Sequence, residues 1–499
     1  MKALDHVMIL ASAGSGKTHA LTDRFVALLA GGAPPERIAA LTFTRKAAGE
    51  FFDEILRKLA RAAADDDAAR KLAQAIEAPE CGRADFLRLL RVVTTAMHRL
   101  NLGTLDSFFA RIVRAFPLEL GLTGDFEILQ EHAARLERRR VQRRMFAHAG
   151  GGPDAAQQDF IEAFKRATFG REEKRLGATL DRFLDEYGEA FLAAPEAAKW
   201  GRAEKIWPDG APWFAHAAPQ EREAAARALR EAVPWSELSE KQRVRLENFF
   251  AELPAWSPGG ELPKAVSYVL DNALESWPTL AEIVVERKRV SLPPAARTAL
   301  RRLVGGIVGA ELARRLEMTA GVFAVLRGYE EVYDAAVRRG GRLTFADVQR
   351  LLQPVALTRD AALDARLFID WRLDAQIDHW LLDEFQDTSY GQWGVLRNLI
   401  DEAVQDASRA RSFFYVGDVK QAIFTWREGD PRLFREIFSH YNSARPGAIR
   451  EARLDRSWRS GPPIIAMVNR TFGDAKALKN LFPAETARRW SEEWRDHQS

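Results

Sequence analysis

The sequence has little cysteine, no long apolar run and almost no net charge. Its single cysteine, Cys81, cannot form an intramolecular disulfide, a zinc ribbon or an iron–sulfur cluster, and such a count is typical of a reducing compartment. The longest apolar run, residues 303–310, contains three glycines and is far too short to span a bilayer. Lys and Arg exceed Asp and Glu by 73 − 70 = 3, so a polyanion would have to be met by local basic patches. We therefore expect a cytoplasmic protein that makes no membrane contact.

The composition is that of an ordinary globular protein. Hydrophobic residues make up 47% of the chain and charged residues 29%, which is close to the average for globular proteins and excludes a disordered, collagenous or coiled-coil chain. A length of 499 residues favours about three domains.

The first hundred residues alternate between strand and helix patterns. Short apolar runs at residues 7–10 and 38–43 are each followed by a helical pattern, at residues 18–30 and 45–64. This alternation predicts a parallel sheet with crossover helices.

The middle of the chain reads differently. Residues 125–335 are rich in Ala, Glu, Arg and Leu at helical spacing, and strand-like runs return only at residues 379–382 and 412–416. The pattern predicts an α/β domain that is interrupted by a helical insertion. Basic runs at residues 138–144 and 287–289 fit either a solvated helix face or contact with a nucleic-acid backbone.

A glycine-rich loop between the first strand and the first helix is the strongest motif. In a P-loop the backbone N–H groups cradle phosphates, a lysine lies on the β- and γ-phosphates, and a hydroxyl residue binds Mg²⁺. A chance glycine turn is the alternative. The predicted phosphate-binding residues are Ala11, Ser12, Ala13, Gly14, Ser15, Gly16, Lys17 and Thr18.

A pair of acids follows the apolar run at residues 379–382. We expect Asp383 to hold Mg²⁺ together with Thr18, and Glu384 to polarise the attacking water, because a P-loop NTPase needs a carboxylate at a strand end and a group that orients water. A solvated acidic turn is the alternative reading of this pair.

Four further segments share the vocabulary of one family. They are LTFTRKAAGEF at residues 41–51, DEFQDT at 383–388, VGDVKQAIFTWR at 416–427 and DRSWRS at 455–460. Together with the alanine that opens the P-loop, this set resembles the UvrD/RecB/AddA type of DNA helicase, and most of all its RecB and AddA branch. The resemblance implies a RecA-like P-loop NTPase core with a large all-α insertion and the start of a second motor domain.

The resemblance also implies a function. It is that of an ATP-dependent DNA helicase or translocase, moving 3′ to 5′, in a helicase or helicase–nuclease subunit of double-strand-break repair. ATP and Mg²⁺ would be its cofactors, single-stranded DNA and duplex ends its partners, and a second helicase or nuclease subunit is a further expected partner. An ATP-responsive DNA-binding fragment without unwinding activity is the alternative, and a metabolic P-loop kinase a distant third.

Residue roles carried over from the family concern both ligands. Gln421 and Arg459 would act with Glu384 at the γ-phosphate, and Trp458 would stack on adenine. Asp106 stands where the family usually has histidine, which puts a phosphate contact there in doubt because an acid repels phosphate. For the aromatic residues of the DNA set, core packing is the alternative to base stacking. The expected DNA contacts are Phe43, Thr44, Thr104, Ser107, Phe424, Trp426 and Arg427.

These motifs divide the chain into four expected parts. Residues 1–124 and 339–450 would form the ATPase core, 125–338 the helical insertion and 451–499 the start of the second motor domain. The family's later motor motifs and a nuclease are not found in the sequence after Arg459. We therefore expect this chain to be the N-terminal portion of a longer protein.

Overall fold

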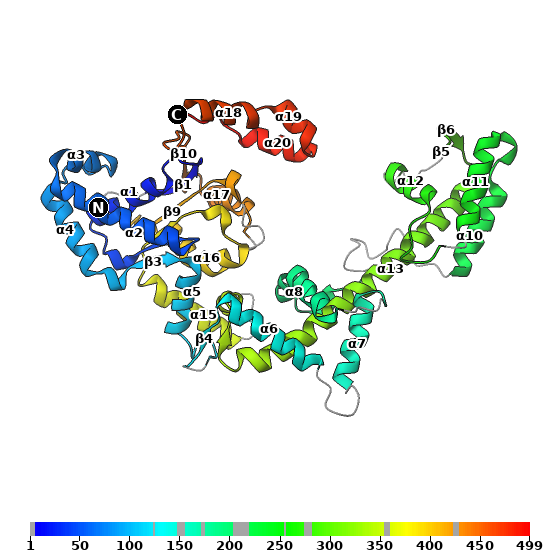
Figure 1. Cartoon of the computed structure of the whole chain (residues 1–499), viewed down its shortest axis with the longest axis horizontal. Helices are drawn as coiled ribbons and strands as arrows, with labels where there is room; N and C mark the ends of the chain where they lie inside the picture. The colour runs from blue at the N-terminus through cyan, green and yellow to red at the C-terminus, as the bar shows by residue number, and fades with distance from the viewer. Residues whose placement is uncertain are drawn as a thin grey trace. The chain divides into compact units, whose positions relative to one another are not determined.

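The computed structural model describes residues 5–122, 125–146, 155–170, 175–202, 219–253, 256–273, 282–353, 360–422 and 429–499. The chain divides into two compact units (Figure 1). The core unit comprises residues 1–134 and 339–499, and the inserted unit comprises residues 135–338.

A six-stranded parallel sheet organises the described part of the core unit. Its spatial order is β10-β1-β9-β8-β2-β3, so strands from both ends of the chain alternate across it. For example, Val7 pairs with Phe414, and blue and orange ribbon lie together in Figure 1. The strands are β1 (His6–Ala11), β2 (Ile38–Thr42), β3 (Asn101–Thr104), β8 (His379–Leu382), β9 (Ser412–Gly417) and β10 (Ile449–Leu454).

Helices cover both faces of this sheet. Val7 and Ile9 of β1 pack into a core with α1, α2 and α4, whereas Met8 between them faces a second core with α5, α16 and α17. Neighbouring strand residues therefore serve opposite faces, as the pleat requires, and a strand buried on both faces reads as a continuous apolar run. The core-unit helices are α1 (Lys17–Ala30), α2 (Arg45–Ala64), α3 (Asp66–Ala75), α4 (Arg83–Thr95), α5 (Leu105–Ala115), α14 (Phe345–Leu352), α15 (Asp360–Asp374), α16 (Tyr390–Gln405), α17 (Arg432–Ala444), α18 (Pro462–Phe472), α19 (Ala475–Leu481) and α20 (Ala484–Glu493).

A short two-stranded sheet lies where the core unit is interrupted. Strand β4 (Glu127–Ile128) pairs in parallel with β7 (Arg342–Leu343), and the Leu129 N–H donates to the Leu343 carbonyl at 2.7 Å. The two chain segments that flank the insertion are thus hydrogen-bonded to each other.

The inserted unit is mainly helical, but the expectation of an all-α insertion is corrected by a β-hairpin. Ile283 and Val290 pair in its antiparallel ladder, and Glu286 and Arg287 form its tip with φ of 52° and 63°. The charges of residues 287–289 hid the alternation of buried Val285 and Val290 from the sequence reading. The elements are α6 (Glu131–Phe146), which begins in the core unit, α7 (Ala155–Ala167), α8 (Leu176–Ala193), α10 (Pro219–Ala232), α11 (Glu240–Glu252), α12 (Lys264–Ala273), β5 (Glu282–Val285), β6 (Lys288–Ser291) and α13 (Pro294–Tyr333).

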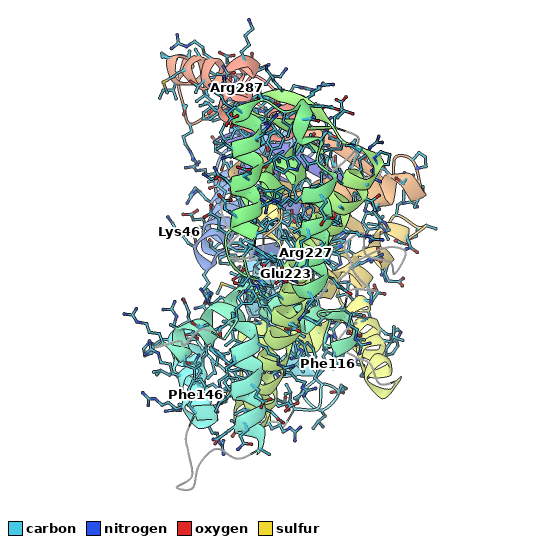
Figure 2. All side chains as sticks on the ribbon, turned by 90° about the vertical axis from the view of Figure 1, so that its right-hand side faces the viewer. Lys46, Phe116, Phe146, Glu223, Arg227 and Arg287 are labelled. Atoms are coloured by element: carbon cyan, nitrogen blue, oxygen red, sulfur yellow. The ribbon has the colours of Figure 1, made fainter. Side chains whose placement is uncertain are left out.

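The long helix α13 is the axis of the inserted unit. It packs against α7 and α10, as Figure 1 shows. On α10, Ala225 and Leu229 are buried, while Glu223 and Arg227, labelled in Figure 2, are exposed. Helix α10 is therefore amphipathic, with its apolar face in the unit's core. Among the described residues, no helix is both long and apolar enough to cross a membrane.

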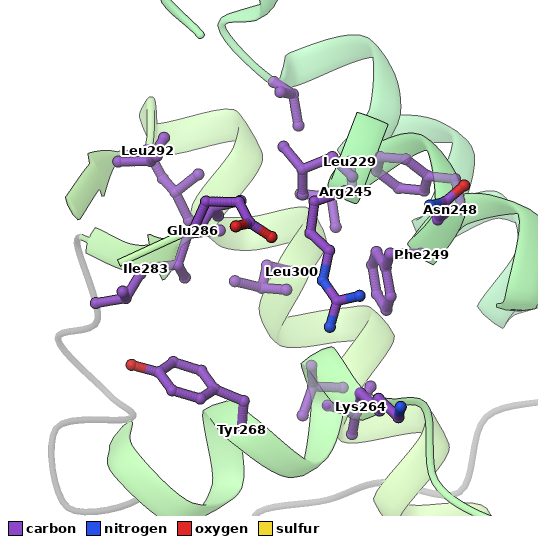
Figure 3. Close-up of a pocket in the computed structure, with 18 of the residues that line it drawn as sticks. Leu229, Arg245, Asn248, Phe249, Lys264, Tyr268, Ile283, Glu286, Leu292 and Leu300 are labelled. Atoms are coloured by element: carbon purple, nitrogen blue, oxygen red, sulfur yellow. The ribbon is translucent and has the colours of Figure 1, made fainter. Parts of the chain in front are cut away.

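A cavity of about 490 Å³ lies between α10, α11, α12, α13 and the hairpin (Figure 3). Its walls are apolar, with Leu229, Phe249 and Leu300 among them, and Arg245 and Lys264 also line it. The hairpin and the helices thus enclose a mostly apolar space within the inserted unit.

Candidate functional site

The glycine-rich loop runs from the carboxyl end of β1 to the amino end of α1. Ser15 Oγ donates to the Ser12 carbonyl at 2.7 Å and accepts from the Ser12 N–H at 3.1 Å, which closes the loop on itself. Gly14 and Gly16 have φ of 69° and 92°, a left-handed conformation that glycine adopts without the cost of a side chain. Ala11 and Ser12 are buried, so the loop is anchored where it leaves the sheet, while Ala13 is exposed.

The start of α1 has no side-chain cap. Gly16 occupies the N-cap position, and no side chain there bonds to the first backbone N–H groups. Such N–H groups and the positive end of the helix dipole favour an anion. Lys17 and Thr18 follow at once, and both are partly exposed.

Lys17 and Glu384 meet across the ends of β1 and β8. Lys17 Nζ lies 2.6 Å from Glu384 Oε2, although the two residues are 367 positions apart. Only 11% of the Lys17 side chain is exposed, so this charge pair is poorly screened by water. Glu384 has φ of 48°, a left-handed conformation that is unusual for a residue with a side chain and is typical of functional sites.

Asp383 is buried at the end of β8. Burial, and next the neighbouring charge of Glu384, raise the pKa of Asp383 from 3.8 to about 6, while Lys17 lowers it. Asp383 Oδ1 accepts the Glu384 N–H at 2.9 Å. A buried carboxylate of this kind is stabilised by a nearby cation, and carboxylate and hydroxyl oxygens are the donors that Mg²⁺ prefers. Asp383 and Thr18 therefore fit a magnesium ion.

The turn after β9 reaches the glycine-rich loop. The Gln421 N–H donates to the Asp418 carbonyl at 2.9 Å, and Lys420 Nζ lies 3.2 Å from Ser12 Oγ. Burial raises the pKa of Asp418, against the lowering effect of Lys420. Gln421 and Lys420 also line a cavity of about 270 Å³ beside Ala13. The turn thus lies against the loop that the sequence predicted to hold phosphates.

The segment after β10 lies on the other side of the loop. The Trp458 N–H donates to the Gly14 carbonyl at 2.9 Å, and a Cβ on Gly14 would come within 2.5 Å of Arg459. Trp458 is 72% exposed, and its ring lies under the Arg456 guanidinium at 4.4 Å. A Cβ on Gly16 would lie 3.7 Å from His19 and 3.9 Å from Trp458. These two side chains therefore flank the end of the loop.

Phe43 and Thr44 follow β2, at the same edge of the sheet as Asp383. Thr44 caps α2 and accepts the Ala47 N–H at 3.1 Å. Phe43 is partly exposed. An exposed face on Phe43 keeps base stacking open beside the core-packing alternative.

Thr104 and Ser107 form a capping box at the start of α5. Ser107 Oγ donates to the Thr104 carbonyl at 2.7 Å, and Thr104 Oγ1 accepts the Ser107 N–H at 3.1 Å. The Ser107 hydroxyl proton is therefore engaged locally. Asp106 accepts from Gln392 at 3.4 Å, which gives this acid a structural partner.

Three expected DNA contacts, Phe424, Trp426 and Arg427, lie outside the described residues. Conversely, the sequence reading assigned no role to three residues that the structure places at the site. Gln386 and Lys420 stand inside motifs that were recognised, so their position was a signal. His497, whose Nδ1 lies 3.2 Å from Ser12 Oγ, has no sequence signal at all.

Residues 2–442 match the UvrD/REP helicase N-terminal domain. The chain belongs to the UvrD/REP helicase family. Three relatives of this UvrD/REP chain each carry a name that makes them a subunit of an ATP-dependent helicase/nuclease. The protein of Geobacillus kaustophilus is 23% identical over 505 residues, that of Lactobacillus delbrueckii 25% over 509, and that of Moorella thermoacetica 26% over 501.

The family match covers most of this chain but less of its relatives. The three alignments include 93%, 93% and 94% of the chain, but only 38%, 38% and 34% of the respective relatives. The chain thus spans little more than a third of the length of the curated relatives it matches.

Proposed function

We propose that this UvrD/REP family chain is the motor segment of an ATP-dependent DNA helicase. The observation that carries the proposal is the 2.6 Å contact between Lys17 and Glu384, with Gln386 linking Glu384 to the turn that carries Gln421. The group expected on the phosphates, the group expected to activate water and the expected sensor of ATP thus share one edge of the sheet. Movement from 3′ to 5′ and work in double-strand-break repair belong to the same proposal.

Binding of the nucleotide would use the glycine-rich loop and Lys17. The backbone N–H groups of the loop and the uncapped start of α1 favour the phosphate charge. Lys17 would leave Glu384 for the β- and γ-phosphates. Glu384, no longer neutralised by Lys17, would then orient the attacking water.

Mg²⁺ would be held by Thr18 and Asp383, whose oxygens suit it. When bound, the ion neutralises phosphate charge during transfer. The buried Asp383 carboxylate would keep its place through the N–H of Glu384, so the metal ligand and the water-activating acid share one fixed backbone.

Gln421 and Arg459 would act at the γ-phosphate from the two sides of the loop. A positive charge there stabilises the charge that develops during transfer. Trp458 would stack on the adenine, since it is exposed beside the loop end, and His19 flanks the same end. The adenine ring would then lie near the end of the loop.

Single-stranded DNA would lie across the carboxyl ends of β2 and β3. Phe43, Thr44 and the Thr104 hydroxyl support this placement, and the Ser107 proton would need to leave the Thr104 carbonyl to join. Phe424, Trp426 and Arg427 remain proposed contacts from the sequence. Stacking suits a motor because every base offers a π-face whatever its identity.

The relatives' shared name describes them as subunits with helicase and nuclease activities. We therefore propose that the partner of this chain is a second helicase or nuclease subunit, and that duplex ends are the loading site.

ATP hydrolysis with and without single-stranded DNA tests the proposal, with strand separation measured on duplexes carrying a 3′ or a 5′ overhang. We expect hydrolysis that rises with DNA and unwinding that requires the 3′ overhang. Stimulated hydrolysis without unwinding would favour the alternative, an ATP-responsive DNA-binding segment. Hydrolysis that ignores DNA would contradict the motor.

A further inference from the structure

Gln386 joins the two halves of the site through its side-chain amide. Its Oε1 accepts the Asp418 N–H at 2.9 Å, and its Nε2 donates to Glu384 Oε2 at 2.8 Å and to Asp387 Oδ2 at 3.2 Å. The backbone N–H of Asp418 can only donate, and the two carboxylates, when ionised, can only accept. The hydrogen bonds therefore fix the orientation of the amide.

The surroundings are shaped around this side chain. Gln386 is 2% exposed, and a Cβ on Gly417 would lie 2.4 Å from its Oε1. The amide thus occupies the space that any other residue at position 417 would fill. With three hydrogen bonds in a site closed to water, its rotamer is well determined.

Gln386 and Lys17 donate to the same atom, Glu384 Oε2. If phosphates draw Lys17 away, Gln386 remains as a donor that holds this oxygen. The other carboxylate oxygen then keeps a defined direction for the water. On its far side Gln386 holds Asp418, whose carbonyl accepts the Gln421 N–H at 2.9 Å. A continuous set of hydrogen bonds therefore runs from Glu384 to Gln421.

We propose that Gln386 is a positioning residue that orients Glu384 and couples it to the Asp418–Gln421 turn, so that a shift of this turn changes the rate of hydrolysis. The inference rests on the proposed function and names a control point within that site. Gln386 touches neither the nucleotide nor DNA; it acts through Glu384 and Asp418.

Gln386→Leu removes both hydrogen bonds, whereas Gln386→Glu keeps an acceptor for the Asp418 N–H but loses the donor to Glu384. In both variants we expect kcat to fall about 10- to 100-fold, as is typical when a residue that orients a catalytic group is lost. The affinity for a fluorescent ATP analogue with Mg²⁺ should stay within about threefold, since the glycine-rich loop is unchanged. For Gln386→Leu the stimulation by single-stranded DNA should also fall towards one.

Two further variants serve as comparison and control. Gly417→Ala should reproduce the loss of kcat, because its methyl group displaces the Gln386 amide. Gln405→Leu, at the exposed end of α16, should behave as the wild type. The melting temperature of each variant shows whether the fold is retained.

Several outcomes would overturn the inference while leaving the motor intact. A wild-type kcat and DNA stimulation in Gln386→Leu would do so, as would a wild-type kcat in Gln386→Glu. A joint loss of melting temperature and nucleotide affinity in both would reduce Gln386 to a structural residue. If the wild type itself shows no DNA-stimulated hydrolysis, the proposed function fails first and the inference with it.

Discussion

At the scale of single residues, the site consists of charges that compensate one another. Lys17 is paired with Glu384, and Asp383 is buried beside both with a raised pKa. Lys17 is the cation that offsets the close pair of acids, while Glu384 occupies a left-handed backbone position. The two side chains of the pair should therefore fail in different ways when they are replaced.

Lys17→Ala should weaken binding of MgATP and abolish hydrolysis, because phosphoryl transfer depends on positioned positive charge. Glu384→Gln should retain binding, since Asp383 remains, but should lower kcat by about 10²- to 10³-fold as the water loses its base. Isothermal titration and steady-state hydrolysis separate the two variants. Equal losses of nucleotide affinity in both would contradict this division of roles.

Trp426→Ala is a prediction from the sequence alone. If Trp426 stacks on a base, its loss should weaken binding of single-stranded DNA by roughly 1–3 kcal/mol and leave DNA-free nucleotide binding unchanged. Trp371, which is 64% exposed on α15, offers a matched control, and Trp371→Ala should bind DNA normally. Fluorescence anisotropy with a labelled oligonucleotide measures both.

A core position for Trp426 gives a different result. Deletion of a buried tryptophan costs about 3–5 kcal/mol of stability, so the melting temperature and both ligand affinities would fall together. That pattern would end the stacking hypothesis.

At the scale of elements, α13 shows how close packing sets the choice of residue. A Cβ on Gly321 would lie 2.6 Å from the Ala167 nitrogen and 2.8 Å from the Ala163 oxygen of α7. These are backbone atoms, which cannot move aside without moving the helix. Two turns further on, a Cβ on Gly328 would meet the Phe160 ring at 3.6 Å, an ordinary contact.

Gly321→Ala should therefore destabilise the inserted unit by about 1–3 kcal/mol, the usual effect of overpacking. Gly328→Ala, on the same helix and facing the same neighbour, should be neutral or stabilising by up to about 1 kcal/mol because alanine favours helix. Urea unfolding followed by circular dichroism compares the two variants. If Gly321→Ala is as stable as Gly328→Ala, α7 and α13 do not pack as closely as described.

At the scale of the whole molecule, stability should depend on pH through two buried histidines of the sheet. His6 accepts the Phe413 N–H at 3.0 Å, and His379 contacts Ser412 Oγ at 3.0 Å. Burial lowers the pKa of each from 6.5 to about 4; nearby Arg445 and Arg24 add to this for His6, and Arg24 and Arg37 for His379. Both are neutral in the folded sheet near pH 5, whereas the unfolded chain binds protons there.

The free energy of unfolding should consequently fall as the pH drops from about 6.5 to about 4, by up to about 3 kcal/mol for each histidine. His379→Asn should reduce this dependence, because asparagine does not titrate. His98→Asn, at an exposed position, should leave it unchanged. Urea unfolding at pH 7, 6 and 5 tests this, and an identical pH dependence in His379→Asn and wild type would refute it.

The sequence by itself determined the local elements and the chemistry of the motifs. Residues 379–382 and 45–64 were predicted at the bounds that β8 and α2 have, and the P-loop and the acid pair were recognised from spacing alone. These features depend on neighbouring residues: an apolar run buries a strand, and glycines allow the backbone of a phosphate loop. Family membership followed from the same motifs.

Only the tertiary structure decided which of these elements meet. The order β10-β1-β9-β8-β2-β3 brings Lys17 to Glu384 across 367 residues and the Asp418 N–H to Gln386. The hairpin at residues 282–291 was hidden by its charges and formed because Val285 and Val290 are buried in the inserted unit. Local propensity does not encode such contacts, since strand order and burial are set by how the whole core excludes water.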